Sequence, residues 1–324
     1  MLKYKWMCVA VFCCAMFAAC EPTEVASDQN PISFNNGPAR AQEVSASAAN
    51  ARIWAYYTKS NETTPNWVWD GENAKLDIGT TTDDNGNFNG TFTVNGNTKY
   101  WDNGTYNFYS IYSEDFKDNE NIATYDYEDN ELTFTYSIAN QKELRLATAT
   151  DLGATNTYNK AVPFQFNHLL SKIKFQGFST DATPTVTLKT ITISSVAHTA
   201  TYTIAADGTV ELSLSTESDD IQPLSSTREF SLTDQATLVM EKVVFPQTIV
   251  EEQIEFKVTY DTSSGENEKS AFLPATTWEA GKSYLYKFYI QPAGPIIFGE
   301  VVKVELWGDR TEIPLDFDIT PEGN

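Results

Sequence analysis

Histidine and cysteine are scarce in this chain, and their scarcity limits the chemistry available to it. The 324 residues include only two histidines, His168 and His198, and four cysteines, all within the first twenty residues. A Ser-His-Asp triad would need one of these histidines, and the Gly-x-Ser-x-Gly sequence around many nucleophilic serines does not occur. We interpret His168 as a partly buried residue that bonds nearby backbone, not as a catalytic base.

Carboxylates are abundant, but their spacing singles out no catalytic pair. Two carboxylates at a suitable separation could hydrolyse glycosides, so a secreted glycoside hydrolase stays open as an alternative. The acidic run 83–87 does not fit an EF-hand, because Thr81 and Phe92 stand where acidic ligands belong. No Cys/His spacing suits zinc. We therefore expect no metal site and no cofactor, and we interpret the acidic run as a solvated hairpin tip; an irregular calcium site is the alternative.

The overall charge restricts the partners. The chain has 44 Asp and Glu residues against 22 Lys and Arg residues, a net charge of −22. Binding to phosphate-rich surfaces requires clustered cations. This acidity argues against nucleic acid and anionic membrane surfaces as partners, and it favours solubility outside the cell.

The first twenty residues look like an export signal that ends in a modified cysteine. Lys3 and Lys5 precede the apolar run 7–19, which is too short to span a membrane but suits a secretory signal. The run ends Phe17-Ala18-Ala19-Cys20, which resembles the lipobox of bacterial lipoproteins, with Phe17 in place of the usual Leu. We predict a signal peptide over residues 1–19 and a lipid on Cys20; an ordinary cleaved signal is the alternative.

The remainder of the chain has the pattern of β-strands. Large apolar residues alternate with polar ones, as in Leu132, Phe134, Tyr136 and Ile138, and Asn-Gly or Asp-Gly dipeptides separate many of these runs. Length favours more than one domain. The prediction is an all-β protein with two antiparallel β-sandwich domains in tandem, of transthyretin-like or immunoglobulin-like type, over residues 41–160 and 161–324.

The two ends of the chain carry short apolar strands. After a polar tether, Ile32 and Phe34 alternate with polar neighbours and Gly37-Pro38 breaks the strand before Arg40-Ala41. Near the C-terminus, large apolar residues again occupy every second position and would form one edge; they are Ile313, Leu315, Phe317 and Ile319. This last strand could equally belong to the sheet of its own domain.

Together these features resemble the fimbrillins, which build type V pili. The residues that carry the resemblance are the lipobox, Ile32-Ser33-Phe34, Arg40-Ala41, the pattern Phe-x-His-x-x-Ser-Lys-Ile-x-Phe around His168, and the Trp278 to Tyr286 region. The resemblance implies export as a lipoprotein and cleavage between Arg40 and Ala41 by an arginine-specific surface protease. Residues 20–40, the tether and propeptide strand, would then be removed.

The resemblance also implies the partners and the location. Ile32 and Phe34 would leave a groove, and a C-terminal donor strand with Ile313, Leu315, Phe317 and Ile319 would fill it in a head-to-tail contact with other pilus subunits. Before assembly, the acylated Cys20 would sit in lipid of the outer membrane, and the product would be a cell-surface fimbrium. Arg52 is an alternative cleavage site. Pro314 departs from the pattern, because it lacks the N–H of one ladder bond.

Other functions stay open from the sequence alone. The protein could remain anchored without polymerising, as a pilus anchor, a tip subunit or an adhesin for a host protein or glycan. Trp67 and Trp69 could stack on such a glycan, although Trp residues more often cover the edge of a core.

Overall fold

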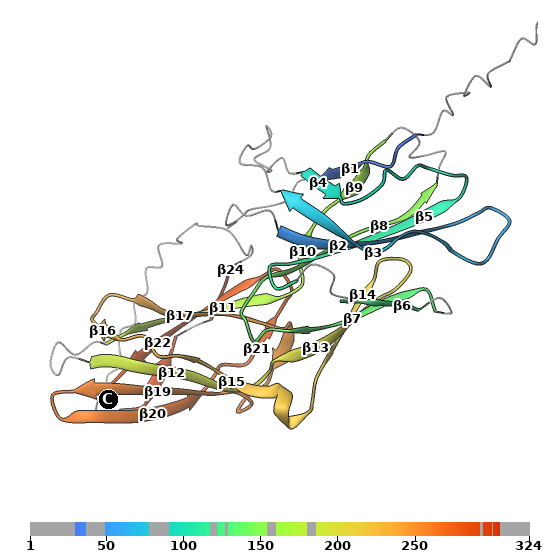
Figure 1. Cartoon of the computed structure of the whole chain (residues 1–324). Helices are drawn as coiled ribbons and strands as arrows, with labels where there is room; N and C mark the ends of the chain where they lie inside the picture. Colours follow the sequence, from blue (N-terminus) through green and yellow to red (C-terminus); the bar gives the residue numbers. More distant parts are fainter. Residues whose placement is uncertain are drawn as a thin grey trace, which may run out of the picture.

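The computed structural model shows an all-β protein (Figure 1), as the sequence predicts. It describes residues 30–36, 49–77, 91–116, 122–126, 129–153, 160–179, 186–291, 294–299 and 301–304. Within these stretches the regular elements are strands, apart from the 3-10 turn η1 (Ser218–Asp220). The same stretches contain no helix that is long and apolar enough to cross a membrane.

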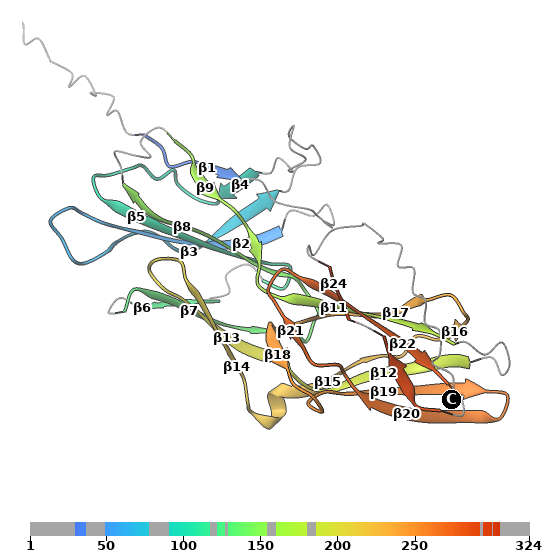
Figure 2. The same cartoon turned by 180° about the vertical axis from the view of Figure 1, so that it is seen from behind.

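A six-stranded antiparallel sheet forms one end of the described structure (Figures 1 and 2). Its strands, in spatial order, are β10 (Asn167–His168), β8 (Leu144–Gly153), β5 (Thr105–Ser113), β2 (Ala49–Thr58), β3 (Asn66–Asp77) and β4 (Thr91–Val94). Both of its faces are buried, because Ile53 and Ala55 join one apolar cluster while Trp54 and Tyr56 join another. The sequence pattern predicts only one buried face, and the difference arises because further strands cover each side.

One face of this sheet is covered by a four-stranded sheet. Its order is β14 (Val210–Leu214), β13 (Thr199–Ile204), β7 (Glu131–Ser137) and β6 (Thr124–Asp126). Contact between the layers is aromatic, with the rings of Tyr56 and Tyr125 centred 4.7 Å apart. Strands from both sides of residue 160 therefore share one sheet, and the division into domains at that residue stays a prediction.

The opposite face is covered by two short strands, β1 (Phe34–Asn36) and β9 (Val162–Phe164), which pair in parallel. They come from distant parts of the sequence but lie side by side above the six-stranded sheet in both views (Figures 1 and 2). Side chains of β1, β9, β2, β5 and β4 form a separate apolar cluster here.

The other end of the molecule is a second sandwich. One sheet contains β17 (Thr237–Val244), β11 (Ser171–Phe178), β22 (Ser283–Ile290), β23 (Ile296–Phe298) and β24 (Val302–Val304). The facing sheet contains β15 (Ile221–Ser226), β12 (Val186–Ala197), β16 (Phe230–Leu232), β19 (Glu255–Thr262) and β20 (Gly265–Phe272). The sheets meet through stacked Phe175 and Phe256, whose ring centroids are 5.1 Å apart. The pair β18 (Gln247–Ile249) and β21 (Thr276–Trp278) lies beside them.

The alternating patterns correspond closely to the buried faces. Leu132, Phe134, Tyr136 and Ile138 are all buried, and Ile254, Phe256, Val258 and Tyr260 are fully enclosed. One of the Asp-Gly dipeptides, Asp207-Gly208, forms the turn of the hairpin that pairs Tyr202 with Leu212, and Gly208 takes a positive φ of 85° there. One departure is that β11 and β22 pair in parallel within an otherwise mostly antiparallel fold.

Candidate functional site

The leader segment, residues 30–36, is held between two other pieces of backbone. On one side, the Ile32 N–H donates to the Lys99 carbonyl at 2.9 Å, and the Trp101 N–H donates to the Asn30 carbonyl at 2.9 Å. On the other side, the Val162 N–H donates to the Ser33 carbonyl at 2.7 Å. The leader is thus antiparallel to residues 99–101 and parallel to β9. It fills a slot that would otherwise have two unpaired strand edges.

Aromatic side chains line this slot, which we call the leader groove: Trp69, Phe92, Trp101, Phe108 and Phe164. The Phe34 ring stacks on Phe164 with centroids 5.0 Å apart and meets the edge of Phe92 at 5.0 Å. Ile32 is buried in the same cluster, whereas Ser33 between them is exposed. The two apolar residues of the leader therefore face the groove, as strand alternation requires.

The other residues predicted for processing and assembly lie outside the described residues. These are Cys20, Arg40 and Ala41 near the start of the chain, and Ile313, Leu315, Phe317 and Ile319 near its end. The acidic run 83–87 lies outside them too. The roles of all these residues, and the removal of Ile32 and Phe34, stay predictions.

Arg52, the alternative cleavage site, is buried in the middle of β2. The residue is 3% exposed, and its backbone lies between Asn73 of β3 and Ile111 of β5. A protease binds its substrate as an extended, accessible strand. Cleavage after Arg52 would therefore require the central sheet to open, which leaves Arg40 as the better candidate.

His168 belongs to a buried ionic cluster, which the sequence did not indicate. Its Nδ1 lies 2.5 Å from Oε1 of Glu143, and the same carboxylate accepts hydrogen bonds from Arg145 at 2.7 and 3.0 Å. Burial lowers the pKa of the His168 imidazole. Burial raises the pKa of Glu143, but its bonds to His168 and the adjacent Arg145 charge outweigh that effect and hold the pKa at about 2.

The two sequence regions around His168 and Trp278 come together in space, which the sequence did not reveal. The Ser171 hydroxyl donates to the Glu279 carbonyl at 2.7 Å, and the Gly281 N–H donates to the Leu170 carbonyl at 2.9 Å. Gly281 has a positive φ of 70°, which glycine adopts readily. These bonds join the start of β11 to the turn before β22. The residues of the two sequence patterns around His168 and Trp278 therefore make a structural contact rather than a catalytic one.

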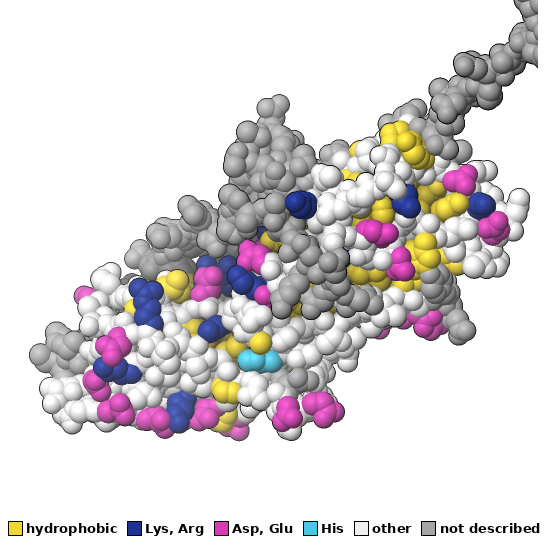
Figure 3. All heavy atoms as spheres, viewed as in Figure 1, with side chains coloured by type: hydrophobic (Ala, Val, Ile, Leu, Met, Phe, Trp, Pro, Cys, Tyr) yellow, Lys and Arg dark blue, Asp and Glu magenta, His cyan; other side chains and the backbone are white. Residues whose placement is uncertain are grey.

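A cleft of about 280 Å³ opens beside this cluster. Its lining is polar and charged: Glu114, Gln141, Lys142, Glu143, Lys172, Glu241, Lys242 and Val243. Lys142 pairs with Glu114 at 2.8 Å, and Lys172 pairs with Glu241 at 3.1 Å. Three lysines and three carboxylates line the cleft, and Lys and Arg side chains likewise lie among Asp and Glu side chains over the face of the molecule drawn in Figure 3.

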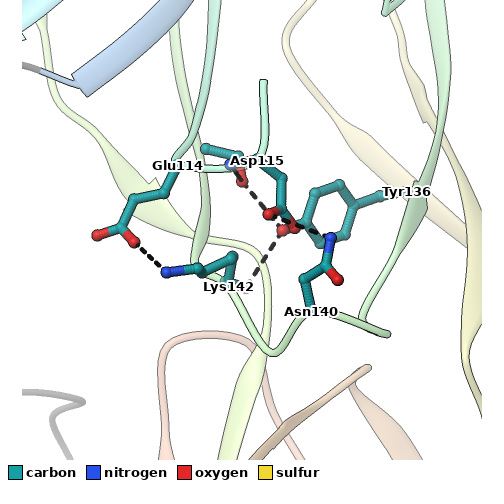
Figure 4. A network of polar contacts seen from close by, with 6 residues as sticks. Glu114, Asp115, Tyr136, Asn140 and Lys142 are labelled. Carbon is teal, nitrogen blue, oxygen red and sulfur yellow. Dashed lines mark hydrogen bonds and ion pairs between the residues drawn. The ribbon is translucent and has the colours of Figure 1, made fainter. Parts of the chain in front are cut away.

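A polar network fixes the loops next to the cleft (Figure 4). The Tyr136 hydroxyl shares a hydrogen bond of 3.0 Å with Ser113 and donates to the Lys142 carbonyl at 3.2 Å. The Nδ2 atom of Asn140 donates a hydrogen bond to Oδ1 of Asp115 at 3.3 Å. These bonds join the ends of β5 and β7, so the network holds the two loops in place and has no evident catalytic geometry.

The tryptophans suggested for glycan stacking are part of the core. Trp69 is 4% exposed and lies in the leader groove cluster. Trp67 is half-buried against Tyr125, at a centroid distance of 5.1 Å. Both rings therefore pack against the apolar clusters on the two faces of the six-stranded sheet. In the described part of the chain, no three His, Cys, Asp or Glu residues gather as a metal would require.

Comparison with known proteins supports the fold seen here. The structure superposes on a proposed cell adhesion protein of Bacteroides uniformis with a TM-score of 0.53 and 19% identity, covering 86% of this chain and 98% of that one. A proposed cell adhesion protein of Bacteroides ovatus gives a TM-score of 0.54 and 17% identity, covering 84% and 97%. A third, from Parabacteroides distasonis, gives 0.50 and 10%, covering 85% and 96%.

The sequence comparison identifies the family. A search of curated proteins finds no match. The model of a family described as fimbrillin-like matches residues 39–307, beginning just after the leader segment. Because this match covers most of the chain, the protein belongs to the fimbrillin-like family.

Proposed function

We propose that this protein is a structural subunit of a cell-surface fimbrium that supports adhesion, and that it polymerises by exchanging its leader segment for a strand of another subunit. The observation that carries the proposal is the leader groove, in which a short terminal segment is paired on both edges and supplies two apolar side chains to an aromatic core. The similarity in fold between this chain and proposed cell adhesion proteins agrees with a role at the cell surface.

Removal of the leader would leave a surface that must be refilled. The Trp101 and Val162 N–H groups and the Lys99 carbonyl would lose their partners, and rings such as Phe92 and Phe164 would become exposed. Unpaired edges and large apolar patches both drive association. An incoming strand would satisfy both demands at once, which is strand addition to a sheet. We infer a structural rather than an enzymatic role.

Processing would begin at the membrane and end after Arg40. Acylated Cys20 would anchor the exported precursor in the outer membrane, with the leader already in its groove. An arginine-specific surface protease would then cut between Arg40 and Ala41. Among the described residues, the hydrogen bonds to residues 99–101 and β9 and the apolar contacts in the leader groove would retain the leader after that cut.

The donor would be the C-terminal strand with Ile313, Leu315, Phe317 and Ile319, supplied by a neighbouring subunit. Each subunit would then give one strand and receive one. Such a head-to-tail contact need not close on itself, so it can generate a filament.

N-terminal sequencing of the assembled protein tests the processing step. We expect the new terminus to be Ala41, and we expect Arg40→Ala to block both cleavage and filament formation. Arg228→Ala, in an exposed loop, is the matched control and should be processed normally. A mature terminus elsewhere would refute the assignment of Arg40.

Replacement of Phe317 by Asp tests the donor. A charge in an aromatic groove is costly to bury, so filaments should be lost while monomer export continues. Asp316→Asn, at a neighbouring polar position, should leave assembly intact. Normal filaments from the Phe317→Asp variant would show that this strand is not the donor.

A second candidate function is a subunit that stays anchored, as a pilus anchor, a tip or an adhesin for a host protein or glycan. The docked leader favours this second function, because in an uncleaved chain the leader already fills the groove. Mass spectrometry of cell-bound protein separates the two functions, since a lipidated Cys20 in the final product indicates the anchored form.

A further inference from the structure

The leader and the C-terminal segment share a five-residue pattern. Residues 31–35 read Pro-Ile-Ser-Phe-Asn, and residues 314–318 read Pro-Leu-Asp-Phe-Asp. Each is Pro, an aliphatic residue, a polar residue, Phe and a polar residue. The leader groove therefore provides a template in which the first four positions of the second segment can be compared with the environments of Pro31, Ile32, Ser33 and Phe34.

The groove tolerates proline at the first position of this pattern. Pro31 lies opposite Tyr100 in an antiparallel bridge. The two hydrogen bonds around that bridge use the Ile32 N–H and the Asn30 carbonyl, so the nitrogen of residue 31 takes no part. In an antiparallel pair, residues alternate between bonded and non-bonded positions, and this is a non-bonded one. Pro314, which looked unsuited to a paired strand, would therefore lose no hydrogen bond to residues 99–101.

The next positions agree with the same alignment. Leu315 would take the buried place of Ile32, and Phe317 would take the place of Phe34 against Phe164. Asp316 would replace Ser33, whose side chain is exposed. A shift by one residue in one direction would instead place Asp316 and Asp318 at the positions of Ile32 and Phe34, and a shift in the other direction would place Pro314 and Asp316 there.

The leader fits the groove imperfectly at its first residue. The Nδ2 atom of Asn30 is buried and has no hydrogen-bond partner among the described residues. A buried polar group without a partner is unfavourable. In the alignment above, this position is Ile313, which has no polar side-chain atom to satisfy. The C-terminal segment would therefore fill the groove better than the leader that first occupies it.

We propose a specific register and direction for the exchange, a proposal that rests on the proposed function. Residues 313–318 of a second copy of this chain replace residues 30–35, with Pro314 opposite Tyr100. The incoming strand runs in the same direction as the leader, parallel to β9 and antiparallel to residues 99–101. The leader is a placeholder that keeps the groove closed and is displaced because Ile313 removes the unsatisfied amide of Asn30.

Disulfide trapping tests this register. The Cα atoms of a non-bonded antiparallel pair are close enough for a disulfide, and Tyr100 is 43% exposed, so its replacement should be tolerated. Full-length chains with Tyr100→Cys and Pro314→Cys are produced in the native host. We expect a ladder of multimers on a non-reducing gel, and mass spectrometry should identify a bridge between positions 100 and 314.

Matched variants keep the cysteine at position 100 and move the donor cysteine out of register. Tyr100→Cys combined with Glu312→Cys or with Asp316→Cys moves the donor cysteine by two residues along the same face, and each should give at least tenfold less multimer. Tyr100→Cys with Pro31→Cys in an Arg40→Ala chain is the positive control, because it should form the bridge within one molecule. The corresponding serine variants should form filaments, which verifies that the substitutions permit assembly.

The outcomes separate the register from the proposed function. Filaments in which the bridge forms through position 312 or 316 would overturn the register but leave strand exchange intact. A 100–314 bridge found only in monomers would overturn the second copy as the donor. Absence of filaments from the unmodified chain and from the serine variants would overturn both proposals.

Discussion

The ring of Phe34 stacks on the ring of Phe164, with their centroids 5.0 Å apart and their planes inclined by 21°. The two residues are distant in sequence but lie in the parallel pair β1 and β9. This contact joins the leader, which the proposed cleavage would release, to the strand that would remain. It provides the most direct way to weaken the leader without changing the groove.

We expect Phe34→Ala to loosen the leader and to lower the free energy of unfolding by about 2–3 kcal/mol, since the ring is half-buried and leaves a cavity. The local signal is faster hydrogen exchange at the Val162 amide, which donates to the Ser33 carbonyl. Ser33→Ala, at an exposed position, is the control and should leave that amide protected. Equal exchange in both variants would show that the ring does not retain the leader.

We expect Asn30→Ile to act in the opposite direction. It removes the buried, unpartnered amide, so the uncleaved precursor should gain about 1 kcal/mol or more of stability. After cleavage, a better-fitting leader should leave more slowly, so filament growth followed by light scattering should be delayed. The exposed change Ser33→Thr should leave the growth rate unaltered. Growth of the Asn30→Ile protein at the normal rate would contradict the placeholder role.

The buried cluster of Glu143, Arg145 and His168 predicts a loss of stability in acid. The pKa of Glu143 is about 2 in the folded protein against an ordinary 4.5, so its contribution is complete above pH 4.5 and is lost as the pH falls toward 2. By the same linkage it amounts to on the order of 3 kcal/mol. The lowered pKa of His168 acts in the same direction from about pH 6.5 downward, because the unfolded chain then takes up its proton first.

Urea unfolding at pH 7, 5 and 3 measures this effect. Glu143→Gln should lower stability at pH 7, because Arg145 is 2% exposed and would lose its partner, and it should flatten the decline below pH 5. Glu114→Gln removes a more exposed pair with Lys142; it should cost at most about 1 kcal/mol and keep the wild-type slope. An unchanged slope in Glu143→Gln would show that another group controls the acid response.

Gln141 connects the loop after β7 to the second sandwich. Its Oε1 accepts from the Val243 N–H at 2.9 Å, and its Nε2 donates to the Val243 carbonyl at 3.3 Å. Gln141→Ala leaves these backbone groups without that partner and should cost about 1–3 kcal/mol. The Val243 amide should exchange faster as well. Asn140→Ala, in the same loop but exposed, should change stability by no more than about 0.5 kcal/mol.

Strand positions could be predicted from the sequence because their signal is local. In β7 and β19, buried residues occur at every second position, and that period is a property of an extended backbone. The pairing of those strands could not be predicted in the same way. β7 pairs with β13, far along the chain, because a shared apolar layer with the six-stranded sheet brings them together.

The candidate site, too, could be predicted from the sequence only in part. The alternation of Ile32 and Phe34 indicated a short strand with one apolar face. No local pattern indicated that β9 would be its neighbour, that residues 99–101 would close the other edge, or that Glu143 would meet His168. A search for buried polar atoms could find Asn30 only after the groove was known.

The sequence by itself determined the all-β class, the alternation of buried side chains and the apolar face of the leader, since these depend on residue type and spacing over a few neighbours. Only the tertiary structure decided that the leader occupies a groove with two open edges, that Arg52 is enclosed in a sheet, and that Pro31 sits where no N–H is needed. These features depend on contacts between segments far apart in the chain, and such contacts are fixed when the apolar layers pack together.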